Sequence, residues 1–361
     1  YMYDPSDYAT RPFGVYKMSD GDKTITIAPW EGPEDNEGQT DIWRIPEKDL
    51  GGWELKFPAL LLETDSEDPF KFTLYWSYMT SQSIIPTKDD NNQTSFNFDD
   101  ENITCLDVVA ISHDEVILDC ANYDEDTKYL RHNVLIHYNV ASKETLHTVT
   151  TDRKLTNANT TCDRKVAYHN FGGKAWVYRW PTLSCANQLI SLGNDVGIEI
   201  LDVSNWENVT SSYLFNETSF GKEDFNFDTV SIFMGDIFVA NTKDTYVARL
   251  TNFEGDYDRA SLSYINIPDY PLAIRAFYDA ILDGSGISLV VATKRTIYRI
   301  DWSDERYPFI VETVAYGIGQ AQEISGVTDL TSVWATPNWY FIMADTDHAI
   351  YTFLRKSHNV S

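Results

Sequence analysis

The sequence is poor in positive charge. It has 28 lysines and arginines against 55 aspartates and glutamates, so the formal net charge of its 361 residues is −27. A surface that binds nucleic acid or an anionic membrane needs clustered basic side chains. The composition therefore argues against both kinds of partner. The acidic excess favours solubility through mutual repulsion or, as an alternative, the attraction of cations or a basic partner.

Long apolar runs are also missing. No stretch of eighteen apolar residues occurs, so no membrane-spanning helix is expected. The sequence begins at Tyr1 without an initiator methionine or a signal peptide, which we interpret as a processed or trimmed product. The apolar share of 43% and the aromatic share of 14% are nevertheless sufficient for a substantial core.

Catalytic signatures are absent. The seven histidines show no HExxH or paired ligand spacing, and no Gly-X-Ser-X-Gly elbow or phosphate-binding glycine loop is present. We therefore predict no catalytic residue, and a non-enzyme is favoured over an enzyme. A glycosidase needs only two carboxylates at a suitable separation, but no pair can be singled out among 55 acids.

Cysteine is scarce, and no CxxC pair points to zinc. Cys105 and Cys120 flank one predicted hairpin almost symmetrically, and Cys162 and Cys185 flank another. Four cysteines allow three pairings, of which we favour 105–120 with 162–185. Buried free thiols are the alternative. Disulfides would place the chain in an oxidising compartment.

Potential N-glycosylation sites support the same compartment. Six Asn-X-Ser/Thr sequons without a central proline occur, most of them in polar stretches: Asn92, Asn102, Asn159, Asn208, Asn216 and Asn359. A glycan is bulky and needs a surface position. We predict a secreted or cell-surface glycoprotein of the secretory pathway.

A repeat dominates the second half of the sequence. Three similar apolar strands carry an alanine at 240, 292 and 344, two equal steps of 52 residues, and a second strand follows each across a short polar turn. The three hairpins pair residues 237–241 with 246–250, 289–293 with 296–300, and 341–345 with 349–353. Two apolar strands with a tight link predict a β-hairpin.

Weaker hairpins extend the series backwards. They pair residues 189–193 with 197–201, 116–121 with 133–140 across a loop at 122–132, 24–28 with 41–45, and 72–79 with 83–85. Seven units of about fifty residues are typical of a β-propeller. We predict an all-β, single propeller of seven blades with four antiparallel strands each, six or eight blades being alternatives.

Ring closure follows from the cost of open sheet edges. We predict that a strand at 13–17 closes the ring by pairing with the last blade, formed by residues 333–355. Residues 1–10 would then be an N-terminal extension and residues 11–361 the propeller domain.

One segment resembles a known family. Residues 197–205, Gly-Ile-Glu-Ile-Leu-Asp-Val-Ser-Asn, are similar to the LVIVD-type propeller repeat, and residues 296–303 and 138–142 are looser copies. The resemblance covers about three of the seven units, and residues 250–252 depart from it. It implies a propeller fold and, for several such proteins, a cell-surface location. It carries no active residue to this chain.

Two kinds of ligand site are candidates. Asn122, Asp124 and Asp126 place oxygen ligands at alternate positions, as calcium loops do, although Thr127 stands where a glycine is expected. No cofactor is required, and a solvated acidic turn is the alternative to calcium. Five tryptophans near predicted turns could stack on sugars or anchor a protein: Trp30, Trp53, Trp206, Trp302 and Trp339. Alternatively, these tryptophan side chains pack over the outer edge of a blade.

The function that these features favour is a non-catalytic module for protein or glycan interaction, or a structural module of an extracellular assembly. Its partner would be an extracellular protein, a glycan or a second copy of the chain. A glycan-active enzyme or lectin that uses acidic and aromatic residues at the propeller mouth is one alternative. A carrier of a small cationic ligand is the other.

Overall fold

The computed structural model describes residues 14–18, 25–29, 57–65, 67–78, 87–124, 129–151, 156–157, 164–171, 173–181, 197–222, 229–253, 255–278, 286–293, 296–316, 330–335, 339–344 and 350–354. Within these residues the chain forms antiparallel strands and short 3-10 helices, without an α-helix. No helix in this part is long and apolar enough to cross a membrane. The predicted all-β class is confirmed.

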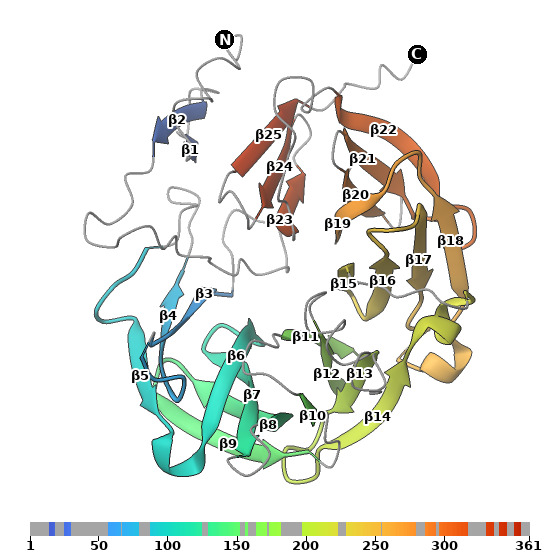
Figure 1. Cartoon of the computed structure of the whole chain (residues 1–361). Coiled ribbons are helices and arrows are strands. Elements are labelled where there is room, and N and C mark those ends of the chain that lie inside the picture. The colour runs from blue at the N-terminus through green and yellow to red at the C-terminus, as the bar shows by residue number, and fades with distance from the viewer. Residues whose placement is uncertain are drawn as a thin grey trace.

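The sheets stand around a common centre like the blades of a propeller (Figure 1). Chain order and sheet order agree, so each strand pairs with the next one along the sequence in nearly all ladders. Strands β6, β11, β15, β19 and β23 lie near the centre, and β5, β9, β14, β18 and β22 lie at the rim (Figure 1). Among the described strands, none pairs with the outer side of these rim strands.

The N-terminal half contains a ribbon, a three-stranded sheet and a five-stranded sheet. The ribbon pairs β1 (Gly14–Met18) with β2 (Ile25–Pro29). The three-stranded sheet contains β3 (Ala59–Thr64), β4 (Lys71–Ser77) and β5 (Gln93–Asn97). After the 3-10 helix η2 (Asp99–Glu101) come β6 (Ile103–Ala110), β7 (Glu115–Asp124), β8 (Tyr129–Asn139), β9 (Glu144–Thr150) and β10 (Thr156–Asn157). Both β9 and β10 pair with β8.

Three four-stranded sheets and a three-stranded sheet follow. The first contains β11 (Arg164–Phe171), β12 (Lys174–Pro181), β13 (Ile198–Asp202) and β14 (Thr210–Phe215). After η3 (Glu217–Phe220) the second contains β15 (Thr229–Phe233), β16 (Asp236–Ala240), β17 (Tyr246–Leu250) and β18 (Leu262–Asn266), with η4 (Tyr257–Arg259) before β18. The third contains β19 (Pro271–Tyr278), β20 (Ile287–Thr293), β21 (Thr296–Asp301) and β22 (Phe309–Tyr316). The last contains β23 (Leu330–Ala335), β24 (Trp339–Ala344) and β25 (Ile350–Leu354).

The 52-residue repeat is confirmed by these strands. Ala240 and Ala344 end β16 and β24, and Ala292 is the last residue but one of β20. Each of these strands pairs with the following strand that the sequence predicts. Short polar links keep such partners adjacent, and the pattern in the sequence therefore predicts the pairing correctly.

Of the weaker hairpins, that of 116–121 with 133–140 is confirmed, since β7 pairs with β8, but two others are wrong in their partners. The strand predicted at 197–201 is β13, which pairs with β12 and β14 rather than with 189–193. Likewise β4 pairs with β3 and β5 rather than with 83–85, whereas the pairing of β2, whose described partner is β1, with 41–45 stays a prediction. Residues 189–193, 83–85 and 41–45 lie outside the described part. Proximity in sequence misled the prediction because β12 and β13 pair across a connection of sixteen residues.

The predicted loop at 122–132 is also wrong. Strand β7 continues to Asp124 and β8 begins at Tyr129, and these two residues are partners in the ladder. Residues 122–124 and 129–132 thus belong to paired strands, and residues 125–128 lie outside the described part. A strand supplies its own backbone hydrogen bonds, so a polar sequence does not prevent pairing.

The core lies between the faces of neighbouring sheets. Trp176 and Tyr178 of β12 pack with Ile237 and Val239 of β16 in one apolar cluster. A second cluster joins the β3–β5 sheet to the β6–β10 sheet and includes Trp76. A third joins the β15–β18 and β19–β22 sheets. Burial of apolar area therefore holds successive sheets together face to face.

The described sheets have two, three, four or five strands rather than four throughout. The strand predicted at 13–17 is β1, shifted by one residue, and its ladder partner is β2. Among the described ladders, none joins β1 to the last sheet.

One predicted disulfide is confirmed. Cys105 on β6 and Cys120 on β7 are bonded and lie directly opposite each other in the ladder, with their Cα atoms 3.9 Å apart. Both side chains are buried in the cluster that joins the two sheets. Cys162 and Cys185 lie outside the described residues, and their pairing stays a prediction.

We expect the double substitution C105A/C120A to lower the free energy of unfolding by about 3 kcal/mol, because a loop of fifteen residues is no longer closed in the unfolded chain. Urea unfolding of the secreted protein and of the variant measures the difference. An equal midpoint for both proteins would show that this cross-link does not stabilise the fold.

Candidate interaction surface

The charged groups best suited to acid–base chemistry are buried between sheets. Arg179 of β12 donates from Nη1 to Asp119 Oδ1 at 3.1 Å and from Nη2 to Glu199 Oε2 at 2.7 Å. All three side chains are completely buried. Asp119 lies on β7, so the ion pairs join two sheets. Burial raises the pKa of the Asp119 carboxyl, and the nearby guanidinium of Arg179 opposes that shift.

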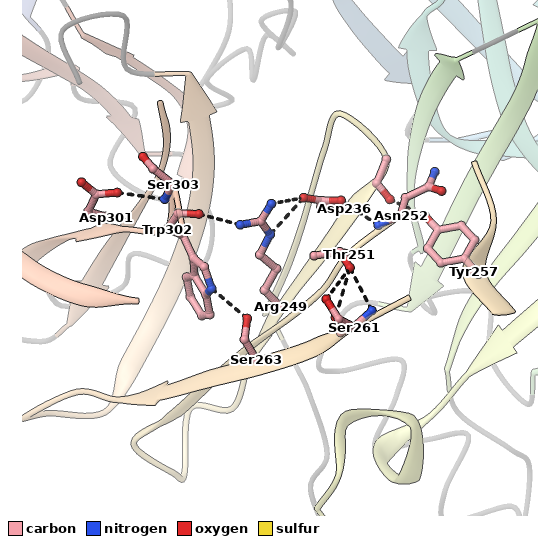
Figure 2. Close-up of polar contacts among 11 residues, drawn as sticks. Asp236, Arg249, Thr251, Asn252, Tyr257, Ser261, Ser263, Asp301, Trp302 and Ser303 are labelled. Carbon is pink, nitrogen blue, oxygen red and sulfur yellow. Dashed lines mark hydrogen bonds and ion pairs between the residues drawn. The ribbon is translucent and has the colours of Figure 1, made fainter. Parts of the chain in front are cut away.

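A second buried arginine joins the next two sheets (Figure 2). Arg249 of β17 donates from Nε to Asp236 Oδ2 at 2.9 Å and from Nη1 to the Trp302 carbonyl oxygen at 2.6 Å. Asp236 Oδ1 accepts from the Asn252 amide at 2.7 Å. Burial raises the pKa of Asp236, and Arg249 opposes the shift. Each of these carboxylates is therefore held in a buried ion pair, away from solvent.

Trp302 belongs to this buried network, and its predicted role in ligand binding is wrong. The ring is completely buried, and its indole Nε1 donates to Ser263 Oγ on β18 at 2.9 Å (Figure 2). It also meets Phe238 edge to face, with ring centroids 5.6 Å apart. Its position just after β21 looks like a turn in the sequence. The neighbouring sheet, which the sequence does not reveal, covers the ring.

Trp206 is half-buried and packs on the preceding sheet. Its ring stacks on His137 and His147, with centroids 4.6 and 5.9 Å apart. His137 Nε2 lies 3.2 Å from Glu115 Oε2, and burial lowers the pKa of this histidine. The ring therefore closes the junction between β8, β9 and the turn after β13, as the packing alternative requires.

The other three predicted tryptophans remain untested. Trp339 begins β24, but the direction of its side chain is outside the described structure. Trp30 and Trp53 lie outside the described residues altogether. A role of these three side chains in binding stays a prediction.

Large apolar side chains are exposed on and beside the rim strands instead. Tyr264 on β18 is 59% exposed and Phe309 on β22 is 55% exposed. The remaining large exposed apolar side chains in the described part are Leu146, Met234, Phe253, Leu262, Tyr270 and Tyr307. We define Leu262, Tyr264 and the other residues of β18 as the β18 edge. Sequence reasoning missed this edge, although its residues Leu-Ser-Tyr-Ile-Asn carry no charge.

Exposed side chains of the β18 edge contact a neighbouring strand of the same sheet and the glycine that follows η3. The ring of Tyr264 stacks on Tyr246 of β17, with centroids 5.1 Å apart. The Lys222 ammonium lies 4.8 Å from the Tyr246 ring centroid and forms an ion pair with Asp244. Leu262 lies against Gly221, where an added Cβ would meet the leucine side chain. These contacts fix the orientation of the exposed side chains.

An open groove of about 400 Å³ lies on the β3–β5 sheet. It is lined by Glu63, Asp65 and Lys71 together with hydroxyl, amide and phenylalanine side chains. Glu63 accepts from Lys88 Nζ at 2.5 Å, and Thr73 and Ser95 share a hydrogen bond of 3.0 Å. Hydroxyls and carboxylates together suit a polar ligand such as a sugar.

The described sequons lie at strand ends. Asn208 is exposed in the turn before β14, and Asn92 is half-buried just before β5. Asn216 caps η3, where its Oδ1 accepts from Thr218 Oγ1 at 2.7 Å. Asn102 has a left-handed backbone (φ 52°) and directly precedes the inner strand β6, rather than lying toward a rim strand. Asn159 and Asn359 lie outside the described residues.

Two of the three predicted calcium ligands lie in a strand rather than in a loop. Asn122 and Asp124 are in strand β7, two positions apart, whereas Asp126 is outside the described residues. In the part of the chain that the structure describes, no three His, Cys, Asp or Glu side chains gather as a metal site. Calcium binding here stays a prediction.

Comparisons with known proteins name no relative. No family model matches the sequence, and no curated protein sequence matches it. The LVIVD-type repeat therefore stays a prediction.

Solved structures match over most of the chain, at low identity. A complex of KlAtg21 with the coiled coil of AgAtg16 matches at a TM-score of 0.45 with 10% identity, covering 82% of this chain and 80% of that one. BBS1N in complex with ARL6DN matches at 0.44 with 12% identity, covering 84% and 76%. The allergen Mala s 1 of Malassezia sympodialis matches at 0.43 with 8% identity, covering 89% and 98%. Because these TM-scores are below 0.5, the matches carry no argument about the fold, which is described from its own strand pairings.

We expect Arg249→Met to lower the free energy of unfolding by about 3–5 kcal/mol, because it leaves the buried Asp236 carboxylate without its counter-charge. The matched double variant R249M/D236N removes that charge and keeps an acceptor for the Asn252 amide. It should recover part of the loss in chemical unfolding. Equal stability of the two variants would show that the unpaired charge is not the cause.

Proposed function

We propose that this chain is a secreted, N-glycosylated β-propeller that acts as a non-catalytic interaction module in an extracellular assembly. The observation that carries the proposal is the exposure of Tyr264, Leu262 and Phe309 at the rim. Exposed aromatic and aliphatic side chains are the usual anchors of protein interfaces. The buried arginine–carboxylate pairs point the same way, since they leave these carboxylates no access to a substrate.

We further propose seven blades in one closed ring made by residues 11–361, with residues 1–10 outside it. The equal spacing of β16, β20 and β24 supports blades of similar length. Strand β1 lies next to β25, which supports closure through the N-terminal ribbon. Closure would remove two open sheet edges, and such edges promote aggregation.

A carbohydrate-binding or carbohydrate-cleaving activity is the second candidate, and the groove on the β3–β5 sheet favours it. Glu63 and Asp65 supply two carboxylates there. Two carboxyl groups on either side of a glycosidic bond are sufficient for hydrolysis. The lysine partner of Glu63 argues for binding rather than cleavage, because an ion-paired carboxylate is a poor general acid.

Hydrolysis distinguishes these candidates. The secreted protein is incubated with a panel of end-labelled oligosaccharides, and released sugars are measured by chromatography beside the Glu63→Gln variant. We expect no product above the level of heat-inactivated protein. Turnover that disappears in the Glu63→Gln variant would replace the non-catalytic module with a glycosidase.

Glycan occupancy tests the secretory location. For protein secreted from a eukaryotic host, we expect nearly complete glycosylation at Asn208 and lower occupancy at Asn102. The exposed turn at Asn208 leaves room for a bulky glycan, whereas Asn102 is held between η2 and β6. Site-resolved mass spectrometry after deglycosylation in heavy-oxygen water measures both, and Asn208→Gln is the control. Empty sequons throughout would contradict the proposal.

A further inference from the structure

The edge of β18 differs from the edges of the equivalent strands. Natural sheets protect their outer strands with bulges, charges or proline. The ladders of β14 and β22 both contain register shifts, whereas the five residue pairs between β17 and β18 run without one. Strand β18 also contains no charged residue and no proline. It is therefore the rim strand of the three four-stranded sheets with the least protection against pairing.

The backbone groups of β18 can be assigned a direction. The Thr251 amide donates to the Ser261 oxygen, and the Ile267 amide donates to the Thr245 oxygen, so odd-numbered residues from 261 to 267 bond toward β17. The amides and carbonyls of Leu262, Tyr264 and Asn266 consequently point outward. The side chains of these three residues are exposed as well.

We propose that β18 is a self-association site, at which a second copy of this chain adds its own β18 antiparallel to the first. This inference rests on the proposed interaction module and names its partner and surface. A twofold axis at Tyr264 would place Tyr264 opposite Tyr264 of the partner subunit, and Leu262 opposite Asn266 of the partner subunit. Outward-facing residues in such register exchange both backbone hydrogen bonds.

Charge restricts where a second copy can approach. Two molecules that each carry a formal charge of −27 repel each other over most of their surfaces. An uncharged strand that offers leucine, tyrosine and asparagine lets the backbones approach with little local repulsion. The two tyrosine rings at the axis would also shield each other from water. A five-residue edge is small for an interface, so the association is weak and is sought at high concentration.

Sedimentation velocity over a range of concentrations tests the proposal with the full secreted chain. We expect a concentration-dependent dimer, and we expect Tyr264→Lys to weaken its dissociation constant by about tenfold or more, since two like charges would meet at the axis. Phe309→Lys is the matched control, because it places the same charge at an equally exposed aromatic position on the bulged strand β22. We expect its dissociation constant to stay within about twofold of the unchanged protein.

Cross-linking keeps the test independent of folding in the lysine variant. Hydrogen-bonded antiparallel pairs have Cα atoms about 5.5 Å apart, a distance that a disulfide spans. We expect Tyr264→Cys to form a covalent dimer on mild oxidation, visible on a non-reducing gel, and Phe309→Cys to stay monomeric.

A protein that remains monomeric at every concentration, or cysteine variants that cross-link equally, would overturn the self-association site. Glycan turnover in the hydrolysis experiment would overturn the non-catalytic function and leave the dimer unaffected. The two failures are therefore distinguishable.

Discussion

The packing of sheet faces against neighbouring sheets is the interaction on which the other features depend. A single antiparallel sheet can leave one face in water, but the inner sheets of this chain contribute to clusters on both sides. Both faces of β16 are buried along its whole length for this reason. Such strands read as continuous apolar runs rather than as alternating ones. The exposed parts are then restricted to turns and rim strands.

Buried arginines fix how neighbouring sheets are aligned on each other. The hydrophobic effect is non-directional, whereas Arg179 and Arg249 each bond to a partner on the adjacent sheet. Removal of one partner would leave a buried charge, which is far more costly than a misplaced methyl group. The register between sheets is thereby fixed, and Trp302 strengthens the same junction through its indole hydrogen bond.

The same architecture concentrates possible functions at the rim and on sheet faces that no neighbour covers. The buried carboxylates between the sheets form ion pairs with Arg179 and Arg249. Among the described features that face solvent are the β18 edge, the groove on the β3–β5 sheet and the turn at Asn208. The interaction module that we propose would use the exposed side chains among these features.

Local patterns in the sequence determined much of this protein. The all-β class, the hairpins around Ala240, Ala292 and Ala344, and the Cys105–Cys120 bond all depend on partners a few residues apart, so short-range spacing was sufficient. The tertiary structure decided which strands pair across long connections, such as β12 with β13, and which residues are covered. Trp302 follows a strand just as Trp206 does, yet one is completely buried and the other half-exposed. Their surroundings come from sheets far away in the sequence. Likewise Tyr264 is exposed because β18 is the last strand of its sheet, and that position is a property of the sheet order, which no local pattern encodes.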